Sequence, residues 1–337
     1  MNSMNNRPIF VVSAPRSGST LFRLILDAHP GIAMPPPAWL YELIRPFAYS
    51  YGDPISDENF LEMCEDILNT PTITQWNLGV DGPTLARDSE TRDFKGAFAE
   101  LHRVYAETTG KPRWGEKSPR NSFWMDEIIE DFPDAQFLHI VRDGRDMAID
   151  ISDSPLMRPY SIYTGAHVWL RYLTAIRDSA SRLDSTQFYE VKYESLCANP
   201  EGEMKKVCDF LGEDFEPAML SHHLSNQTSS WASDPQHAKT ARPITTDFCG
   251  MYKTRLSKTD AGYLESVFAD LMKAYGYPLV GPAEVPARWA GQMLQSDLVT
   301  SPANYQYKSK LIERRNARRE RGVYANDDRE SLLMSPV

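Results

Sequence analysis

A cation, two hydroxyls and a glycine stand together near the start of the chain, at Arg16 to Ser19. The preceding run Ile9 to Val12 is apolar and mostly β-branched, which predicts a parallel strand buried on both faces. Thr20 to Leu26 then has helical spacing. The N–H groups at a helix N-terminus attract anions, and Gly18 lets the backbone approach an oxyanion closely. The segment therefore predicts a cradle for phosphate or sulfate, which Arg16 can grip in bidentate fashion.

This loop differs from the loop that binds nucleoside triphosphates. That pattern, G-x-x-x-x-G-K-[ST], requires a glycine where Ser13 stands and a lysine where Ser19 stands. A β- or γ-phosphate would lose its usual cation, so a P-loop nucleotide kinase or ATPase is disfavoured. A strand, turn and helix without any ligand is the other alternative, and the positioned Arg16 weighs against it.

A second candidate anion site is Val141-Arg-Asp-Gly-Arg-Asp146, which follows an apolar run over Ala135 to Val141. Ligands of open α/β sheets bind at the carboxyl ends of the strands. Gly144 permits a tight turn there, and Arg142 is placed to meet a phosphate. By itself the segment is equally consistent with a salt-bridged turn.

Lys117 ends a third predicted strand, within Trp114-Gly-Glu-Lys-Ser-Pro119. Lysine is rarely buried, so a lysine beside proline at a strand end is hard to explain by packing. A surface lysine whose stem covers apolar neighbours is the alternative interpretation.

Together these motifs resemble the PAPS-dependent sulfotransferases. The first loop is similar to the P-R-S-G-[ST]-[ST]-[LW] of that family, and Leu26-Asp-Ala-His-Pro30 resembles its tyrosylprotein and bacterial members. The resemblance implies that the loop holds the 5′-phosphosulfate of PAPS (3′-phosphoadenosine 5′-phosphosulfate) and that no metal is required. It also places Arg16 near the transferring sulfuryl group. The donor ligands that it implies in this loop are Arg16, Ser17, Gly18, Ser19 and Thr20.

The other two motifs also have counterparts in the family. The Arg142 segment resembles the 3′-phosphate motif, in which a serine follows eight residues after the first arginine. That position is Asp150, and a carboxylate facing a dianionic phosphate is repulsive. Either Ser152 replaces it, or Arg142 and other groups hold the phosphate. Lys117 corresponds to the lysine that stabilises the departing phosphate. Later cations that could close over the nucleotide are His237, Lys239, Arg242 and Lys253.

The general base has no clear counterpart. By analogy with phosphoryl transfer, sulfuryl transfer needs charge stabilisation and a base for the proton of the acceptor. In tyrosylprotein sulfotransferases a glutamate lies on the loop after D-A-H-P, and its position in this chain is Pro37. Glu42, one helical turn beyond Ala38, is the substitute candidate for this catalytic role. Weaker candidates are His29, His139 and His167.

The elements that must position these residues alternate between strands and helices. A further strand is predicted over Phe188 to Lys192, and helices over Gly96 to Glu107, Gly165 to Leu183 and Thr259 to Tyr275. Such alternation implies parallel βαβ units. We therefore expect an α/β fold in which helices flank a P-loop-like central parallel sheet, as a single domain with helical and loop insertions.

The domain is expected to span residues 1–280, with a substrate-side insertion over about residues 35–110. The aromatic run from Trp39 to Tyr51 would line an apolar acceptor pocket or form a core helix. Residues 281–337 are expected to form a C-terminal extension, with a solvated basic helix near Lys308 to Arg321 and a flexible end.

Composition limits the classes of function. The chain has 337 residues, 42% of them hydrophobic, and its net charge of −10 argues against a nucleic-acid partner. Its four cysteines are scattered without a C-x-x-C pair, which favours free buried thiols in a reducing compartment. No stretch approaches the roughly 20 apolar residues of a membrane span, and the polar N-terminus has no signal-peptide core. A cytoplasmic location is expected.

The sequence thus favours a PAPS-dependent sulfotransferase acting on a hydroxyl or amine of a small or medium-sized acceptor. The expected partners are the nucleotide donor and a small-molecule or peptide acceptor, and a homodimer is left open. Pro37 and Asp150 motivate the alternative, a catalytically impaired PAPS- or PAP-binding protein of the same fold.

Overall fold

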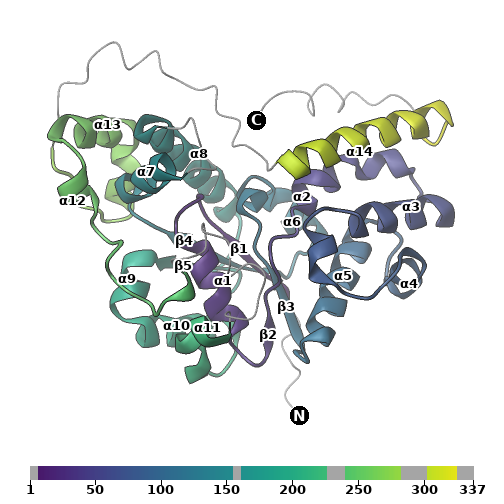
Figure 1. Cartoon of the computed structure of the whole chain (residues 1–337), viewed down its shortest axis with the longest axis horizontal. Coiled ribbons are helices and arrows are strands. Elements are labelled where there is room, and N and C mark those ends of the chain that lie inside the picture. The colour runs from purple at the N-terminus through teal and green to yellow at the C-terminus, as the bar shows by residue number, and fades with distance from the viewer. Residues whose placement is uncertain (1–6, 155–160, 226–239, 282–301, 325–337) are drawn as a thin grey trace.

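The computed structural model describes residues 7–154, 161–225, 240–281 and 302–324 (Figure 1). Its centre is a five-stranded sheet with the order β2-β3-β1-β4-β5, in which neighbouring strands run parallel. The strands are β1 (Ile9–Val12), β2 (Ile32–Ala33), β3 (Arg113–Glu116), β4 (Gln136–Val141) and β5 (Phe188–Lys192). The expected α/β fold with a central parallel sheet is confirmed.

Helices cover both faces of the sheet. Several begin at a side chain that caps them; the Ser257 hydroxyl, for example, accepts from the Asp260 N–H at 3.0 Å. The α-helices are α1 (Ser19–Asp27), α2 (Leu40–Leu43), α3 (Asp57–Leu68), α4 (Gly82–Asp88), α5 (Phe94–Thr108), α6 (Met125–Asp131), α7 (Gly144–Asp153), α8 (Ile162–Ala180), α9 (Tyr193–Ala198), α10 (Pro200–Leu211), α11 (His222–Ser225), α12 (Tyr252–Arg255), α13 (Lys258–Ala274) and α14 (Pro302–Glu320). The 3₁₀ helices are η1 (Arg45–Tyr51), η2 (Ile73–Trp76), η3 (Pro119–Phe123) and η5 (Pro217–Ser221).

The central strand β1 is buried on both faces, which explains its uninterrupted apolar sequence. Ile9 and Val11 pack in a core cluster with residues of α1, α9 and α10. Phe10 and Val12 point to the opposite face and pack against the helices of the segment between β2 and β3. Since alternate residues of a strand face opposite ways, each face requires its own apolar set.

The chain order around β1 creates the place for a ligand. β3 pairs with one edge of β1 and β4 with the other, so the connections leave β1 in opposite directions. A crevice forms at the carboxyl ends of the strands at such a switch point. The loops that follow β1, β3 and β4 contain Arg16, Lys117 and Arg142, and all three begin at this edge.

The aromatic run from Trp39 to Tyr51 belongs to the core. It forms α2 and η1, and the side chains of Tyr41, Phe47 and Tyr51 are at most 2% exposed. These three residues pack in the cluster that contains Phe10. The core interpretation therefore holds for these three side chains, whereas Trp39 and Tyr49 are only partly buried.

The basic C-terminal helix is not solvated on all sides, which corrects the expectation from composition. Figure 1 shows α14 lying across α2 and α3. Leu311 is 1% exposed and Arg318 is fully buried. Arg318 forms an ion pair with Glu62 of α3 at 2.7 Å, so the basic face of α14 meets an acidic face within the same chain.

Two further expectations concern cysteines and membranes. Cys64, Cys197 and Cys208 are buried free thiols, and Cys249 is a partly exposed one. In the described ranges, no helix has the length and apolar character needed to cross a bilayer.

Candidate active site

The loop after β1 together with the first residues of α1, residues 13–20 (the anion loop), has an unusual backbone. Arg16 has a φ of 63°, a region that non-glycine residues rarely adopt, and Gly18 has a φ of 88° at the N-cap of α1. Ser13 is fixed from behind, because its N–H donates to the Ser122 hydroxyl at 3.1 Å and its carbonyl accepts from that hydroxyl at 3.0 Å. Strain at a non-glycine residue is typical of functional sites.

Buried donors around this loop have no partner in the described part of the chain. They are the Nε of Arg16, the Oγ of Ser17 and the Nε of Arg142. A buried polar group without a hydrogen bond is costly, and native structures seldom contain one without a reason. Two guanidinium nitrogens and a hydroxyl at the N-terminus of α1 match the donors that a phosphate or sulfate group requires.

Lys117 reaches the first turn of α1 from the end of β3. Its Nζ lies 3.5 Å from the Oγ1 of Thr20, in the first turn of α1, and the residue is only 4% exposed. Burial lowers the pKa of Lys117 to about 7, with a further lowering from the nearby Arg23 guanidinium and a partial offset by Glu116. Lys117 is therefore a buried lysine beside the anion loop, and the surface-lysine interpretation is wrong.

Glu116 connects the end of β3 to the loop that precedes α2. Its carboxylate accepts hydrogen bonds from the Ser118 N–H at 3.2 Å and the Ala38 N–H at 3.3 Å, and from the Asn121 amide. The Ser118 hydroxyl in turn accepts from the Trp39 N–H at 2.8 Å. Burial raises the pKa of Glu116. This network holds the Lys117 backbone and the segment of Pro37, Ala38 and Trp39 in one arrangement.

Arg142 joins the second motif to the first. Its Nη1 donates to the Arg16 carbonyl at 2.8 Å and also pairs with the Asp150 carboxylate. Its Nη2 donates to the Phe248 carbonyl at 2.7 Å, and its own carbonyl accepts from the Trp169 indole N–H at 2.9 Å. The guanidinium therefore bridges the anion loop and the loop that contains Phe248, residues 240–251 (the C-terminal loop).

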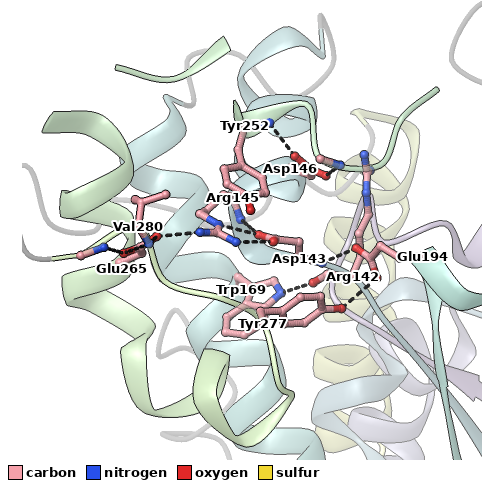
Figure 2. Close-up of polar contacts among 12 residues, drawn as sticks. Arg142, Asp143, Arg145, Asp146, Trp169, Glu194, Tyr252, Glu265, Tyr277 and Val280 are labelled. Atoms are coloured by element: carbon pink, nitrogen blue, oxygen red, sulfur yellow. Dashed lines mark hydrogen bonds and ion pairs between the residues drawn. The ribbon is translucent and has the colours of Figure 1, made fainter. Parts of the chain in front are cut away.

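The remaining charged residues of this motif are structural. Figure 2 shows the guanidinium of Arg145 between the carboxylates of Asp143 and Glu265, each at 2.6 Å, and it lies 3.5 Å from the centre of the Tyr252 ring. Asp146 accepts from the Gly250 N–H at 2.6 Å and the Tyr252 N–H at 2.8 Å. The salt-bridged turn thus describes Asp143 and Arg145, and Asp146 holds the backbone of residues 250–252, whereas Arg142 faces the cavity.

One cavity joins the anion loop, Arg142 and the C-terminal loop. Its lining residues are Arg16, Gly18, Ser19, Thr20, Leu21, Arg142, Asp150, Tyr193, Thr240, Arg242, Pro243, Ile244, Thr245 and Phe248. Four residues of the predicted anion loop are among them, as is Arg242, named above among the later cations. The analysis of the sequence missed Tyr193, Thr240 and Phe248. Tyr193 directly follows β5, as Lys117 directly follows β3, and this position at the carboxyl end of a strand could have indicated a site residue.

Several predicted site residues lie away from this cavity. Ser152 donates its hydroxyl to the Ile149 carbonyl at 3.2 Å, within its own helix. Lys253 is exposed on α12, 5.9 Å from the centre of the Tyr252 ring. Ser17, which is fully buried, and Lys117 are not among the residues that line this cavity, and Lys239 and His237 lie outside the described residues.

The predicted base candidates contact protein groups outside the cavity lining. Glu42 is 3.0 Å from the Nε of Arg120 and 4.0 Å from the Nζ of Lys308 on α14, and it is 7% exposed. The three histidines have other contacts: His29 with the Asp214 carbonyl, His139 with Glu190 and His167 with the Tyr263 hydroxyl. Glu42 as a base remains a prediction.

The parallel sheet, with an anion loop after β1 and a second arginine after β4, places the chain among α/β proteins of the P-loop-like class. Comparison with known proteins gives the family. The model of the sulfotransferase family matches residues 8–217, which is more than half of the chain. The chain belongs to the sulfotransferase family, and it is an enzyme of that class.

Individual relatives are distant. A putative protein-tyrosine sulfotransferase of Caenorhabditis briggsae is 23% identical over 268 residues, which cover 75% of this chain and 84% of that protein. The omega-hydroxy-beta-dihydromenaquinone-9 sulfotransferase Stf3 of Mycobacterium tuberculosis is 31% identical over 133 residues, or 34% of each chain. The acceptors in these names therefore include both proteins and a small molecule.

Solved structures agree on the fold. The sulfotransferase domain from the Synechococcus PCC 7002 olefin synthase has a TM-score of 0.59 at 21% identity, covering 81% of this chain and 96% of that domain. The sulfotransferase domain from the curacin biosynthetic pathway has a TM-score of 0.56 at 20% identity, covering 81% and 99%.

Proposed function

We propose that this sulfotransferase takes its sulfuryl group from PAPS and delivers it to a hydroxyl or amine of a small, medium-sized or peptide acceptor. The observation that carries the proposal is the pair of unpartnered buried donors on Arg16 and Arg142, two residues that line one cavity, together with the buried Ser17 hydroxyl next to Arg16. When bound, PAPS supplies an activated sulfuryl group on a phosphate leaving group. The residues of the chain then have separate tasks.

The anion loop binds and orients the 5′ end of the nucleotide. Arg16 and the N-terminal N–H groups of α1 provide fixed positive potential, and Gly18 keeps the backbone close to the ligand. Lys117, buried beside Thr20, holds a proton where negative charge develops on the departing phosphate. Arg142 binds the phosphate at the other end of the nucleotide. Its Cζ lies 4.9 Å from the centre of the Tyr193 ring.

Two measurements test this function. Calorimetric titration with adenosine 3′,5′-bisphosphate should give binding, and transfer of ³⁵S from labelled PAPS to a panel of phenols, alcohols, amines and tyrosine peptides should give turnover. Arg16→Ala and Lys117→Ala should each abolish transfer while the melting temperature stays near that of the wild type. Near-normal turnover in either variant would refute the assigned roles.

The same measurements separate the alternatives. Binding of the bisphosphate without turnover on any acceptor favours a catalytically impaired binder, which Pro37 and Asp150 motivate and to which the structure adds the ion-paired Glu42. Hydrolysis of Mg-ATP would favour a kinase-like protein. A cytoplasmic location stays a prediction, which cell fractionation tests.

A further inference from the structure

Asp150 places a carboxylate in a cavity whose other charged lining residues are the arginines Arg16, Arg142 and Arg242. It lies on α7 and is 5% exposed. The cavity is the proposed site of a nucleotide with phosphate groups at both ends. A buried carboxylate repels such a ligand, since Coulomb interactions strengthen away from water. The proposed function alone therefore gives no reason for an acidic residue here.

The carboxylate of Asp150 is held against Arg142. Its Oδ2 accepts from Nη1 of Arg142, and both side chains are less than 10% exposed. Arg142 has two further anchors, the carbonyls of Arg16 at 2.8 Å and Phe248 at 2.7 Å. These two backbone contacts fix the guanidinium without help from Asp150. The carboxylate therefore neutralises positive charge on Arg142 with which an incoming phosphate would otherwise pair.

We propose that Asp150 is a specificity-determining residue of the donor site, an internal carboxylate that competes with the ribose-linked phosphate of the nucleotide for Arg142. The inference rests on the proposed function, because it takes the cavity as the nucleotide site. It implies that Asp150 weakens the binding of a nucleotide that carries this second phosphate. A nucleotide that has only the 5′ group should be affected much less.

Removal of the carboxylate should lower the stability of the ligand-free protein but strengthen its binding of the nucleotide. Without Asp150, the buried Arg142 charge loses its counter-charge, which destabilises the empty protein. A bound phosphate restores the missing charge, so the variant should gain more from the ligand than the wild type does. If Asp150 served only to orient Arg142, its removal would weaken binding instead.

The test compares Asp150→Ser and the nearly isosteric Asp150→Asn with the wild type. Asp153→Asn is the matched control, because Asp153 lies on the same helix but pairs with Arg255 at 2.7 Å at the surface and lines no part of the cavity. Calorimetry with adenosine 3′,5′-bisphosphate should show an affinity about tenfold higher or more in both Asp150 variants. With adenosine 5′-monophosphate the change should stay below about threefold. The control should match the wild type with both ligands.

Each other outcome has a defined meaning. Weaker bisphosphate binding in both Asp150 variants, at a melting temperature that shows intact folding, would overturn the proposal and assign Asp150 to the orientation of Arg142. An equal gain with both nucleotides would also overturn it, because the second phosphate would then not be the competitor. If the folded wild type binds the bisphosphate and the variants bind it equally, only this inference fails. If none of the folded proteins binds either nucleotide, the proposed function fails and takes this inference with it.

Discussion

The ring of Tyr193 lies directly against the backbone of Gly18. A β-carbon built on Gly18 would stand 2.4 Å from the Cδ2 of Tyr193, closer than real contacts allow. The φ of 88° at Gly18 is a second and independent reason for glycine at this position. Because the same ring lies 4.9 Å from the Arg142 guanidinium, Tyr193 connects the two anion-binding motifs.

Gly18→Ala should therefore damage the site more than backbone strain alone predicts. Gly110→Ala is the control, since Gly110 has a similar φ of 68° and nothing within 4 Å of an added β-carbon. The control should lose about 1–2 kcal/mol of unfolding free energy and keep its affinity for adenosine 3′,5′-bisphosphate. Gly18→Ala should lose more stability and at least about tenfold in that affinity. Denaturant unfolding and calorimetry measure both, and equal behaviour of the two variants would contradict the clash.

Arg145 should be among the residues on which stability depends most. It is fully buried between Asp143 and Glu265, so Arg145→Ala leaves two buried carboxylates without their counter-charge. Breaking a buried pair in this way costs about 3–5 kcal/mol. Arg255→Ala removes an exposed arginine paired with Asp153 and should cost less than about 1 kcal/mol. Urea unfolding of both variants checks the difference, and a loss below about 1 kcal/mol for Arg145→Ala would argue against the buried network.

The strand, loop and helix around Arg16 were predictable because their signals are local. Burial of β1 on both faces leaves an uninterrupted apolar run, and Gly18 marks the turn into α1. Lys117 was singled out because a lysine beside proline at a strand end is hard to explain by packing. In each case a few neighbouring residues contain the whole pattern.

The opposite wall of the cavity was not predictable in this way. Thr240 and Phe248 reach the site only through the packing of a long loop, and that loop is held by Asp146, about a hundred residues earlier in the chain. The docking of α14 was missed for a related reason. Its basic composition indicates a charged surface, but the sequence does not reveal that Glu62 and Asp66 lie opposite.

Arg318 should anchor the C-terminal helix to the segment between β2 and β3. It is fully buried, pairs with Glu62 at 2.7 Å, donates to the Ser50 hydroxyl at 3.0 Å and lies 3.8 Å from the centre of the Tyr51 ring. Arg318→Ala should cost about 3–5 kcal/mol, whereas Glu320→Ala, at an exposed position of the same helix, should cost less than about 0.5 kcal/mol. Thermal and denaturant unfolding of both variants provide the measurement. Similar losses in the two would mean that α14 is not fixed through Arg318.

The lowered pKa of Lys117 has a defined effect on stability. The pKa is about 7 in the folded protein and 10.5 for an ordinary lysine. Between these values the unfolded chain binds a proton that the folded protein lacks, so this residue makes the protein more stable as pH rises through that window. Below about pH 7 the buried charge opposes folding in full. The stability advantage of Lys117→Met over the wild type should therefore be largest below about pH 7 and shrink toward about pH 10.

Nucleotide binding should change the protonation of Lys117. A bound dianion beside Nζ favours the ammonium form and raises the pKa of Lys117, so binding above about pH 7 must take up a proton. The affinity for adenosine 3′,5′-bisphosphate should fall from about pH 7 to about pH 9, by at most about tenfold per pH unit. Calorimetry in two buffers of different ionisation enthalpy counts the proton directly. Lys117→Met should bind more weakly and lose this proton uptake, with Lys253→Met, at a lysine exposed on α12, as the matched control. Identical proton uptake in the wild type and Lys117→Met would show that another group titrates, and would remove Lys117 from the phosphate.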